Sequence, residues 1–192
     1  MIAPADLALD PDRAALLVLD VQDRLASAMP EQPLDQLERN VAVLAEMARR
    51  FGLPVVVTEQ YPKGLGRTRA AVESAVAELG SQLHRFEKLE FSACDAGAFG
   101  PIWEQLGRDQ WIVIGMECHV CVYQSARGLR ERGATVFVPQ DAVVSRSKQN
   151  WRLGLGLMDT AGCVVTSTEV LVFDALKRAG SEDFKALSRL IR

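Results

Sequence analysis

The sequence predicts an α/β fold, a three-layer α/β/α sandwich around a six-stranded, mostly parallel sheet. Five continuous apolar runs, each closed by polar residues, alternate with segments of helical spacing. Such runs are typical of strands buried on both faces, which occur mainly in parallel sheets covered by crossover helices. A sixth segment alternates apolar and polar residues and predicts a more exposed strand. With no linker or internal repeat, we expect one domain over residues 1–192 with right-handed crossovers.

The expected strands share an apolar core of β-branched and aliphatic residues. In chain order they are residues 14–20, 53–60, 82–88, 111–117, 134–141 and 162–169. The third of these, QLHRFEK, is the alternating one, so we expect it to be the most exposed strand of the sheet.

The segments between the strands place apolar residues three and four positions apart, which predicts helices. The first helix covers residues 34–48, because Pro33 suits a helix start and Gly52 suits its C-cap. A capping-box spacing of Thr166 and Glu169 marks a later helix start. The remaining expected helices cover residues 72–79, 95–107, 122–132, 148–162, 166–180 and 182–192.

Composition and charge exclude several classes of protein. Hydrophobic residues make up 48% and charged residues 24% of the chain, as in ordinary globular proteins, and no apolar stretch reaches the length of a membrane span. The net charge of −3 provides no electrostatic footprint for nucleic acid. The N-terminal stretch has acidic residues where a signal peptide has basic ones, so we expect a cytoplasmic protein.

Cys118 and Cys121 form a C-x-x-C pair between an apolar run and a helical pattern, and four interpretations are open. A redox pair at a helix start is physically sensible, because the helix dipole stabilises a thiolate. A zinc site needs two more ligands at suitable spacing, whereas Cys94 and Cys163 stand alone. We therefore expect no metal and no cofactor. The pair could also be ordinary core residues.

The fourth interpretation makes Cys121 a nucleophile. The start of a helix would lower its pKa and supply backbone N–H groups for an oxyanion. Asp20 and Lys88 each close an expected strand, and the carboxyl ends of parallel strands meet at one edge of the sheet. Asp20 is the candidate proton acceptor, and Lys88 would help to hold the thiolate while it keeps the Asp20 carboxylate oriented.

Three motifs resemble those of the isochorismatase-like cysteine hydrolases. LLVLDVQDRL resembles the family's aspartate motif, FEKLEFSAC its lysine motif, and GMECHVCVYQSARGLRERGATVFVPQDAVVSRS its nucleophile motif with the following helix and strand. The resemblance covers residues 14–176, nearly the whole chain. It implies a Rossmann-like six-stranded sheet and a catalytic triad of Asp20, Lys88 and Cys121.

The resemblance has further implications. A non-proline cis peptide of the family corresponds to the bond between Glu117 and Cys118, and it would direct the backbone N–H groups of Cys118 and Cys121 to one oxyanion hole. The implied activity is hydrolysis of a small amide or related C–N bond through a thioester. The resemblance also implies a homo-oligomer, since members usually assemble as dimers or larger.

The sequence departs from two branches of that family. The segment TEQYPKGLGRTR contains no histidine, so it lacks the ligands with which nicotinamidases hold a catalytic metal. Isochorismatases proper lack the nucleophilic cysteine that is present here. The chain is most similar to the isochorismatase-domain-containing proteins, whose substrates are poorly defined. A thiol redox protein and a non-catalytic binding protein of the same fold remain alternatives.

Five polar residues near the expected strand ends are candidates for the substrate pocket, namely Gln22, Glu59, Gln60, Tyr61 and His119. Each has an ordinary alternative. Gln22 suits plain packing at a strand end, the segment after the second strand suits a solvated turn, and His119 suits a pocket edge or a subunit interface.

Overall fold

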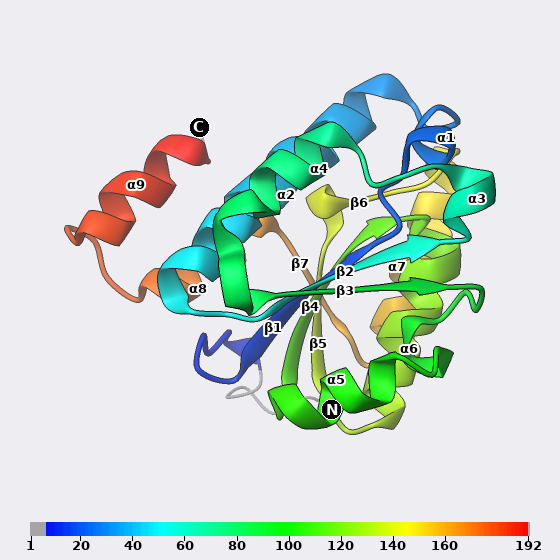
Figure 1. Ribbon diagram of the computed structural model, residues 1–192. Helices are drawn as coiled ribbons and strands as arrows, with labels where there is room; N and C mark the ends of the chain where they lie inside the picture. The colour runs from blue at the N-terminus through cyan, green and yellow to red at the C-terminus, as the bar shows by residue number, and fades with distance from the viewer. Residues whose placement is uncertain (1–6, 192) are drawn as a thin grey trace.

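A parallel sheet of seven strands forms the centre of the protein (Figure 1), and the computed structural model describes residues 7–191. The strand order is β3-β2-β1-β4-β5-β7, and β6 pairs with β4. Within the described residues, each pairing between named strands is parallel. The predicted α/β fold is therefore confirmed, with one strand more than the six expected.

The strands are β1 (Ala14–Leu19), β2 (Val55–Gln60), β3 (Leu83–Lys88), β4 (Gln110–Met116), β5 (Thr135–Pro139), β6 (Val143–Val144) and β7 (Val164–Thr166). The additional strand is β6. It has two residues and pairs with Gly115 and Met116, beyond the part of β4 that pairs with β5. A segment of two residues has no periodicity, so sequence patterning could not reveal it.

The helices are α1 (Asp23–Ala26), α2 (Glu31–Phe51), α3 (Pro62–Leu65), α4 (Ala70–Val76), α5 (Phe99–Leu106), α6 (Tyr123–Glu131), α7 (Lys148–Thr160), α8 (Thr168–Leu176) and α9 (Glu182–Leu190). Shorter helical turns are η2 (Ala77–Gln82), η3 (Ala93–Asp95), η4 (Cys118–Val122) and η5 (Gln140–Ala142). Each expected helix is present. The expected last helix extended to residue 192, which lies outside the described residues.

Local chemistry explains several helix ends. Gly52 has a φ of 72° and forms the left-handed C-cap of α2. The side chain of Ser147 caps α7 and that of Ser167 caps α8, each by accepting a backbone N–H of the first turn. The cap of α8 therefore lies one residue after Thr166, where the capping-box spacing had placed it.

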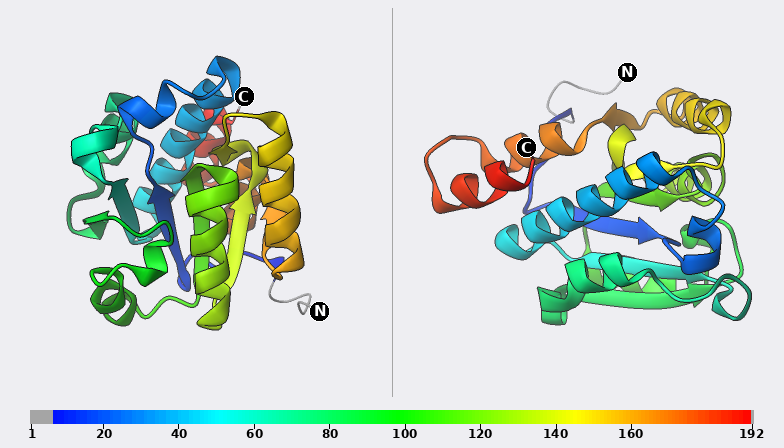
Figure 2. Two further views of the ribbon diagram at one scale, coloured as in Figure 1. Left: turned by 90° about the vertical axis from the view of Figure 1, so that its right-hand side faces the viewer. Right: turned by 90° about the horizontal axis from the view of Figure 1, so that it is seen from above.

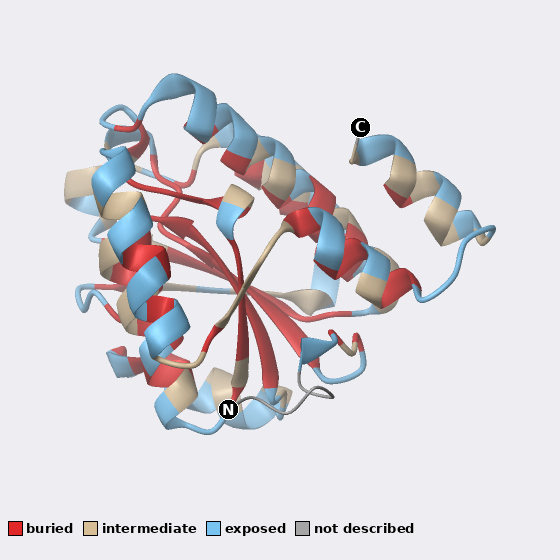
Figure 3. Ribbon diagram, turned by 180° about the vertical axis from the view of Figure 1, so that it is seen from behind, coloured by how far each residue is buried: buried red, intermediate tan, exposed pale blue. Residues whose placement is uncertain are grey.

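Two hydrophobic layers enclose the sheet because alternate strand residues face opposite sides. In β1, Leu16 and Val18 pack with α2, α4 and α8, whereas Leu17 and Leu19 pack with α5, α6 and α7. Figure 2 shows α6 and α7 side by side on one face and α2 across the other. Figure 3 shows the central strands buried and the outer helix faces exposed.

The carboxyl ends of the strands lie together at one edge of the sheet, near α1 and α3 (Figure 1). There β4 approaches β1 so closely that a Cβ at Gly115 would lie 2.1 Å from the Leu19 carbonyl oxygen. Gly115 also has a φ of 118°, a conformation that side chains rarely adopt. This glycine therefore permits the close approach of the segments that lead to Asp20 and Glu117.

No helix among residues 7–191 is both long enough and apolar enough to cross a membrane.

Candidate active site

Asp20 and Lys88 form a completely buried ion pair at the carboxyl ends of β1 and β3. The Lys88 Nζ lies 2.7 Å from Asp20 Oδ2, and neither side chain has exposed surface. Buried charges need compensating hydrogen bonds, because they lose their hydration. The surrounding residues supply such bonds to both partners.

Thr58 holds the second oxygen of the Asp20 carboxylate. Its hydroxyl donates to Asp20 Oδ1 at 2.6 Å. The parallel register places Thr58 opposite Leu19, and its carbonyl accepts the Asp20 N–H at 3.2 Å. Sequence reasoning missed Thr58, although strand alternation places it on the same face as Gln60. Asp20 itself has a φ of 55°, which turns the chain at the end of β1.

The Lys88 ammonium is bound on all sides by protein acceptors. Besides Asp20, it donates to the Gln60 Oε1 at 2.7 Å and to the carbonyl oxygens of Glu90 and Phe91 at 3.2 and 3.3 Å. An ammonium group has three N–H donors. The four acceptors therefore occupy the donors of Lys88, whose charge also lowers the pKa of Cys121.

Cys121 lies in η4, the π-type turn that leads directly into α6. Its residue is 5% exposed, and a hydrogen bond between its thiol and the Asp20 carboxylate contributes to the pKa of both groups. The structure thus brings together Asp20, Lys88 and Cys121, which lie far apart in the sequence. We call these three residues the triad cluster.

The titration of the triad cluster differs from the sequence-based expectation. Burial and, after it, the Asp20 charge raise the pKa of the Cys121 thiol to about 12, and the Lys88 charge opposes this shift. The prediction that the helix start lowers this pKa is wrong, since the net shift is upward and loss of hydration is its largest cause. At neutral pH the resting group is therefore the thiol.

Burial also raises the pKa of Asp20 above its ordinary value of 3.8, while the Lys88 charge and the hydrogen bonds from Lys88, Thr58 and Cys121 oppose the shift. A carboxylate of raised pKa is a stronger base than one in water. This arrangement pairs a protonated thiol with a base that can take its proton.

Cys118 is a fully buried core residue. It has no exposed surface, its thiol donates to the Trp151 carbonyl at 3.5 Å, and burial raises its pKa to about 12. A Cβ at Gly154 of α7 would lie 2.8 Å from both the carbonyl oxygen and the sulfur of Cys118. The four cysteines are free thiols.

The non-proline cis peptide bond lies between Met116 and Glu117. The expected position between Glu117 and Cys118 is therefore wrong by one residue, because a motif spacing does not specify which bond of the turn is cis. The Glu117 carboxylate is buried and accepts the backbone N–H and the Nε of Arg146 at 3.1 and 3.0 Å. Its carbonyl accepts the N–H groups of Val120 and Val122.

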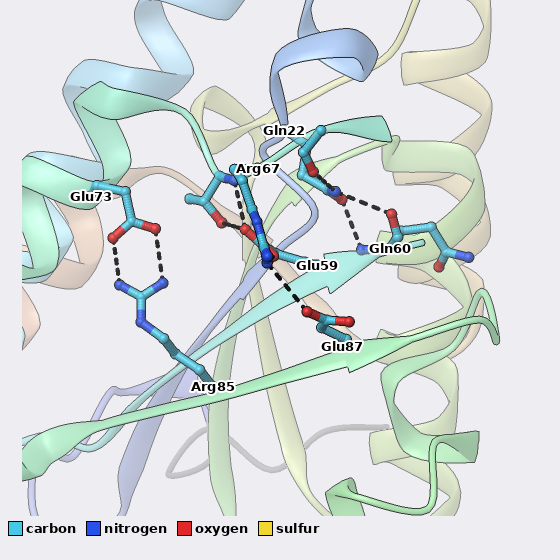
Figure 4. Close-up of polar contacts among 9 residues, drawn as sticks. Gln22, Glu59, Gln60, Arg67, Glu73, Arg85 and Glu87 are labelled. Carbon is cyan, nitrogen blue, oxygen red and sulfur yellow. Dashed lines mark hydrogen bonds and ion pairs between the residues drawn. The ribbon is translucent and has the colours of Figure 1, made fainter. Parts of the chain in front are cut away.

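Gln22 and Gln60 are both buried and are joined by hydrogen bonds (Figure 4). The Gln60 N–H donates to Gln22 Oε1 at 2.7 Å, and Gln22 Nε2 donates to the carbonyl oxygens of Gln60 and Gly66 at 3.1 and 2.6 Å. Both ends of the Gln22 amide are thus bonded to backbone. Of the five pocket candidates, Gln60 bonds to the Lys88 ammonium through its side chain, whereas Tyr61 donates its backbone N–H to the Lys88 carbonyl at 2.9 Å.

Glu59 faces the opposite side of β2 from Gln60, as strand alternation requires. Its carboxylate accepts from the backbone and hydroxyl of Thr68 and from Arg67, and these residues lie beside Glu87 of the neighbouring strand β3 (Figure 4). The hydrogen bonds lower the pKa of Glu59 although burial opposes them. Glu59 therefore belongs to a surface ion-pair network away from the triad cluster.

Tyr61 and His119 lie at the edge of the site. Tyr61 is 51% exposed and has a φ of 38°, a rare conformation for an aromatic residue. His119 Nδ1 lies 3.0 Å from the Ser145 hydroxyl, and Ser145 lines a cavity of about 350 Å³ with Val143, Val144 and Trp151. This cavity is large enough for a small molecule, but its lining includes none of Asp20, Lys88 and Cys121.

Among residues 7–191, no group of three or more His, Cys, Asp or Glu side chains is arranged to hold a metal ion.

The chain is similar to known proteins over most of its length. Residues 14–170 match the family profile described as the isochorismatase domain. The mouse isochorismatase domain-containing protein 2B is 29% identical over 187 residues, covering 95% of this chain and 82% of that protein. The secreted isochorismatase effector Isc1 of Phytophthora sojae is 30% identical over 185 residues, covering 96% of this chain and 87% of that protein.

A solved structure supports the same relationship. The MAR1 ribonuclease from Caenorhabditis elegans superposes with a TM-score of 0.86 at 32% sequence identity, covering 96% of this chain and 92% of that chain. The overall fold and the order of its elements are therefore shared with this relative.

Proposed function

Since this chain belongs to the isochorismatase family, we propose that it is a cysteine hydrolase that cleaves a small amide or related C–N bond through a thioester. The observation that carries the proposal is the triad cluster, in which the protonated Cys121 thiol interacts with a buried carboxylate of raised pKa. Asp20, Lys88 and Cys121 are the proposed catalytic triad.

The first step is attack by Cys121 on the substrate carbonyl carbon. Asp20 takes the thiol proton as the S–C bond forms, because a free thiolate is rare at neutral pH. The electron pair of the carbonyl double bond moves to oxygen and produces a tetrahedral oxyanion. The N–H groups of Cys118 and Cys121 are the proposed donors to this oxyanion.

The second half of the reaction returns the enzyme to its resting state. The tetrahedral intermediate collapses, its C–N bond breaks, and the protonated Asp20 gives its proton to the leaving nitrogen. Water then attacks the thioester while Asp20 takes one of its protons. Collapse of the second intermediate releases the acid and returns the proton from Asp20 to Cys121. Lys88 keeps the Asp20 carboxylate oriented through these steps.

The charges around Cys121 favour an uncharged substrate. Asp20 is paired with Lys88, and Glu117 is paired with Arg146. These pairs leave little net charge to attract an anion. The same reasoning and the net charge of −3 disfavour an RNA substrate, although one structural relative is called a ribonuclease.

A panel of small amides and ureido compounds tests the proposal, with a short RNA as a separate arm. Hydrolysis of an amide and a Cys121 acyl adduct detected by intact mass would support it, and Cys121→Ala should lose both. Cys94→Ala is the matched control, because Cys94 is another buried thiol whose pKa is about 12. Turnover that survives Cys121→Ala would refute the cysteine mechanism.

We also propose a homo-oligomer in a reducing compartment, the cytoplasm. Leu89 and Phe91, in the loop after β3, are 71% and 56% exposed, which suits a contact with another protein surface. The free thiols suit a reducing environment. Light scattering of the purified protein tests the oligomer, and a monomer at all concentrations would contradict it.

A further inference from the structure

We propose that Gln60 is a positioning residue that holds the Lys88 ammonium on Asp20, so that the carboxylate and not the ammonium faces the Cys121 thiol. This inference rests on the proposed function, because it assigns a role within the same triad. Its basis is the geometry of the Lys88 side chain and of the residues behind it.

The register of the sheet makes the contact between Gln60 and Lys88 direct. The two residues are Cα partners at the ends of β2 and β3, and both side chains point to the buried side of the site. The Gln60 Oε1 and the Asp20 Oδ2 each accept a Lys88 N–H at 2.7 Å. The ammonium is therefore fixed between one neutral and one charged acceptor.

The other end of the Gln60 amide is also fixed. Its Nε2 donates to the Leu89 carbonyl at 2.8 Å, so the amide cannot turn without losing this bond. The orientation of the amide is thus set, with oxygen toward Lys88. A reversed amide would point N–H groups at an ammonium, which is unfavourable.

Gln22 fixes the backbone of Gln60 in turn. Its side-chain amide exchanges two hydrogen bonds with the Gln60 backbone, as a neighbouring strand would (Figure 4). A third bond ties Gln22 to the Gly66 carbonyl. The result is a continuous chain of contacts from Gln22 through Gln60 and Lys88 to Asp20.

Without Gln60 the ammonium would lose one of its two shortest contacts. Besides Asp20, only the carbonyl oxygens of Glu90 and Phe91 at 3.2 and 3.3 Å would then remain as its acceptors among the described residues, so the ammonium would no longer be fixed in one position on Asp20 Oδ2. The charged and titratable groups that act on Asp20 are Lys88 and Cys121. A displaced ammonium would leave the Asp20 carboxylate less stabilised and therefore protonated at higher pH.

The test is the pH profile of Cys121 alkylation by iodoacetamide, followed by intact mass and peptide mapping. In the wild type, the rate should rise with pH as Asp20 loses its proton. Gln60→Met preserves the side-chain length but removes the acceptor, and it should move this rise upward by about one pH unit. Gln60→Glu adds a competing carboxylate next to Lys88 and should move the rise further in the same direction.

Gln110→Met is the matched control. Gln110 is a fully buried glutamine whose amide bonds to the backbone of Ala8 and Asp10, and it starts β4 at the opposite end of the sheet. Its loss should lower the melting temperature without moving the profile. If Gln60→Met lowers the melting temperature and leaves the profile unchanged, Gln60 is only structural and the inference is wrong.

A second measurement separates failure of the inference from failure of the proposed function. If wild-type Cys121 labels no faster than Cys94 and Asp20→Asn does not change its rate, the proposed function fails. In that case the ¹⁵N resonance of the Lys88 ammonium still decides the role of Gln60. Slow proton exchange in the wild type and fast exchange in Gln60→Met would support positioning, and equal exchange would overturn it.

Discussion

Lys88 and Asp20 form a fully buried ion pair with an Nζ to Oδ2 distance of 2.7 Å, although 68 positions separate them in the chain. Hydrogen bonds compensate both charged groups for their lost hydration: Thr58 donates to the carboxylate, and Gln60 accepts from the ammonium. Removing one partner of such a pair leaves an uncompensated buried charge, which is strongly unfavourable. Substitutions at the site must therefore preserve size and, where possible, hydrogen bonding.

Asp20→Asn should lower Cys121 alkylation at neutral pH and raise it at high pH. Asp20 provides the base that assists the thiol at neutral pH, and its loss should reduce the rate by about 10²-fold or more. The Asp20 charge also raises the pKa of Cys121, so without it the thiolate forms at lower pH. The two rate profiles should cross below pH 12. A variant profile that lies below the wild type at every pH would contradict this prediction.

Thr58→Val should raise the pH at which Cys121 becomes reactive. Valine preserves the shape of threonine but removes the hydroxyl that donates to Asp20 Oδ1 at 2.6 Å. That hydrogen bond lowers the pKa of Asp20, so its loss moves the acid limb of the alkylation profile upward by about one pH unit. Thr58→Ser retains a hydroxyl and should restore most of the wild-type profile. An unchanged limb in Thr58→Val would show that the hydroxyl has no effect on Asp20.

Cys118→Ser distinguishes the hydrolase from a thiol redox protein. Serine can still donate to the Trp151 carbonyl, as the thiol does at 3.5 Å. We expect turnover to fall by no more than about tenfold and the free energy of unfolding by about 1 to 2 kcal/mol, because a buried sulfur is replaced by a polar group. A redox pair needs both sulfurs, so complete loss of activity with normal folding would favour the redox alternative.

Gly154→Ala should disturb the turn that carries Cys121. The new Cβ would lie 2.8 Å from the carbonyl oxygen and sulfur of Cys118, so α7 must shift, and we expect a loss of about 1 to 3 kcal/mol of unfolding free energy. Gly156→Ala lies on the same helix with no atom within 4 Å of its Cβ, and it should gain about 0.5 to 1 kcal/mol from helix propensity. Urea denaturation measures both. If both substitutions change the free energy of unfolding by the same amount, the close contact at Gly154 does not destabilise the protein.

Sequence alone determined the layered α/β fold, because continuous apolar runs and helical spacings are local patterns that report burial on two faces. It also indicated that Asp20, Lys88 and Cys121 could meet, since the carboxyl ends of parallel strands share one edge, and the resemblance of three motifs selected these residues as a triad. These conclusions depend on the hydrophobic periodicity of short segments and on the general rule that crossovers between parallel strands are right-handed.

Only the tertiary structure determined the hydrogen-bond partners of Asp20 and Lys88 and the direction of the pKa shift of Cys121. The register that places Gln60 opposite Lys88 and Thr58 opposite Leu19 depends on how two strands slide past each other, which no single segment specifies. The two-residue strand β6 likewise exists only through its pairing with β4. The pKa of Cys121 rises because distant segments remove water from it and hold Asp20 beside it. Desolvation is a property of the assembled fold, so the expectation from the helix start, that the pKa of Cys121 falls, has the wrong sign.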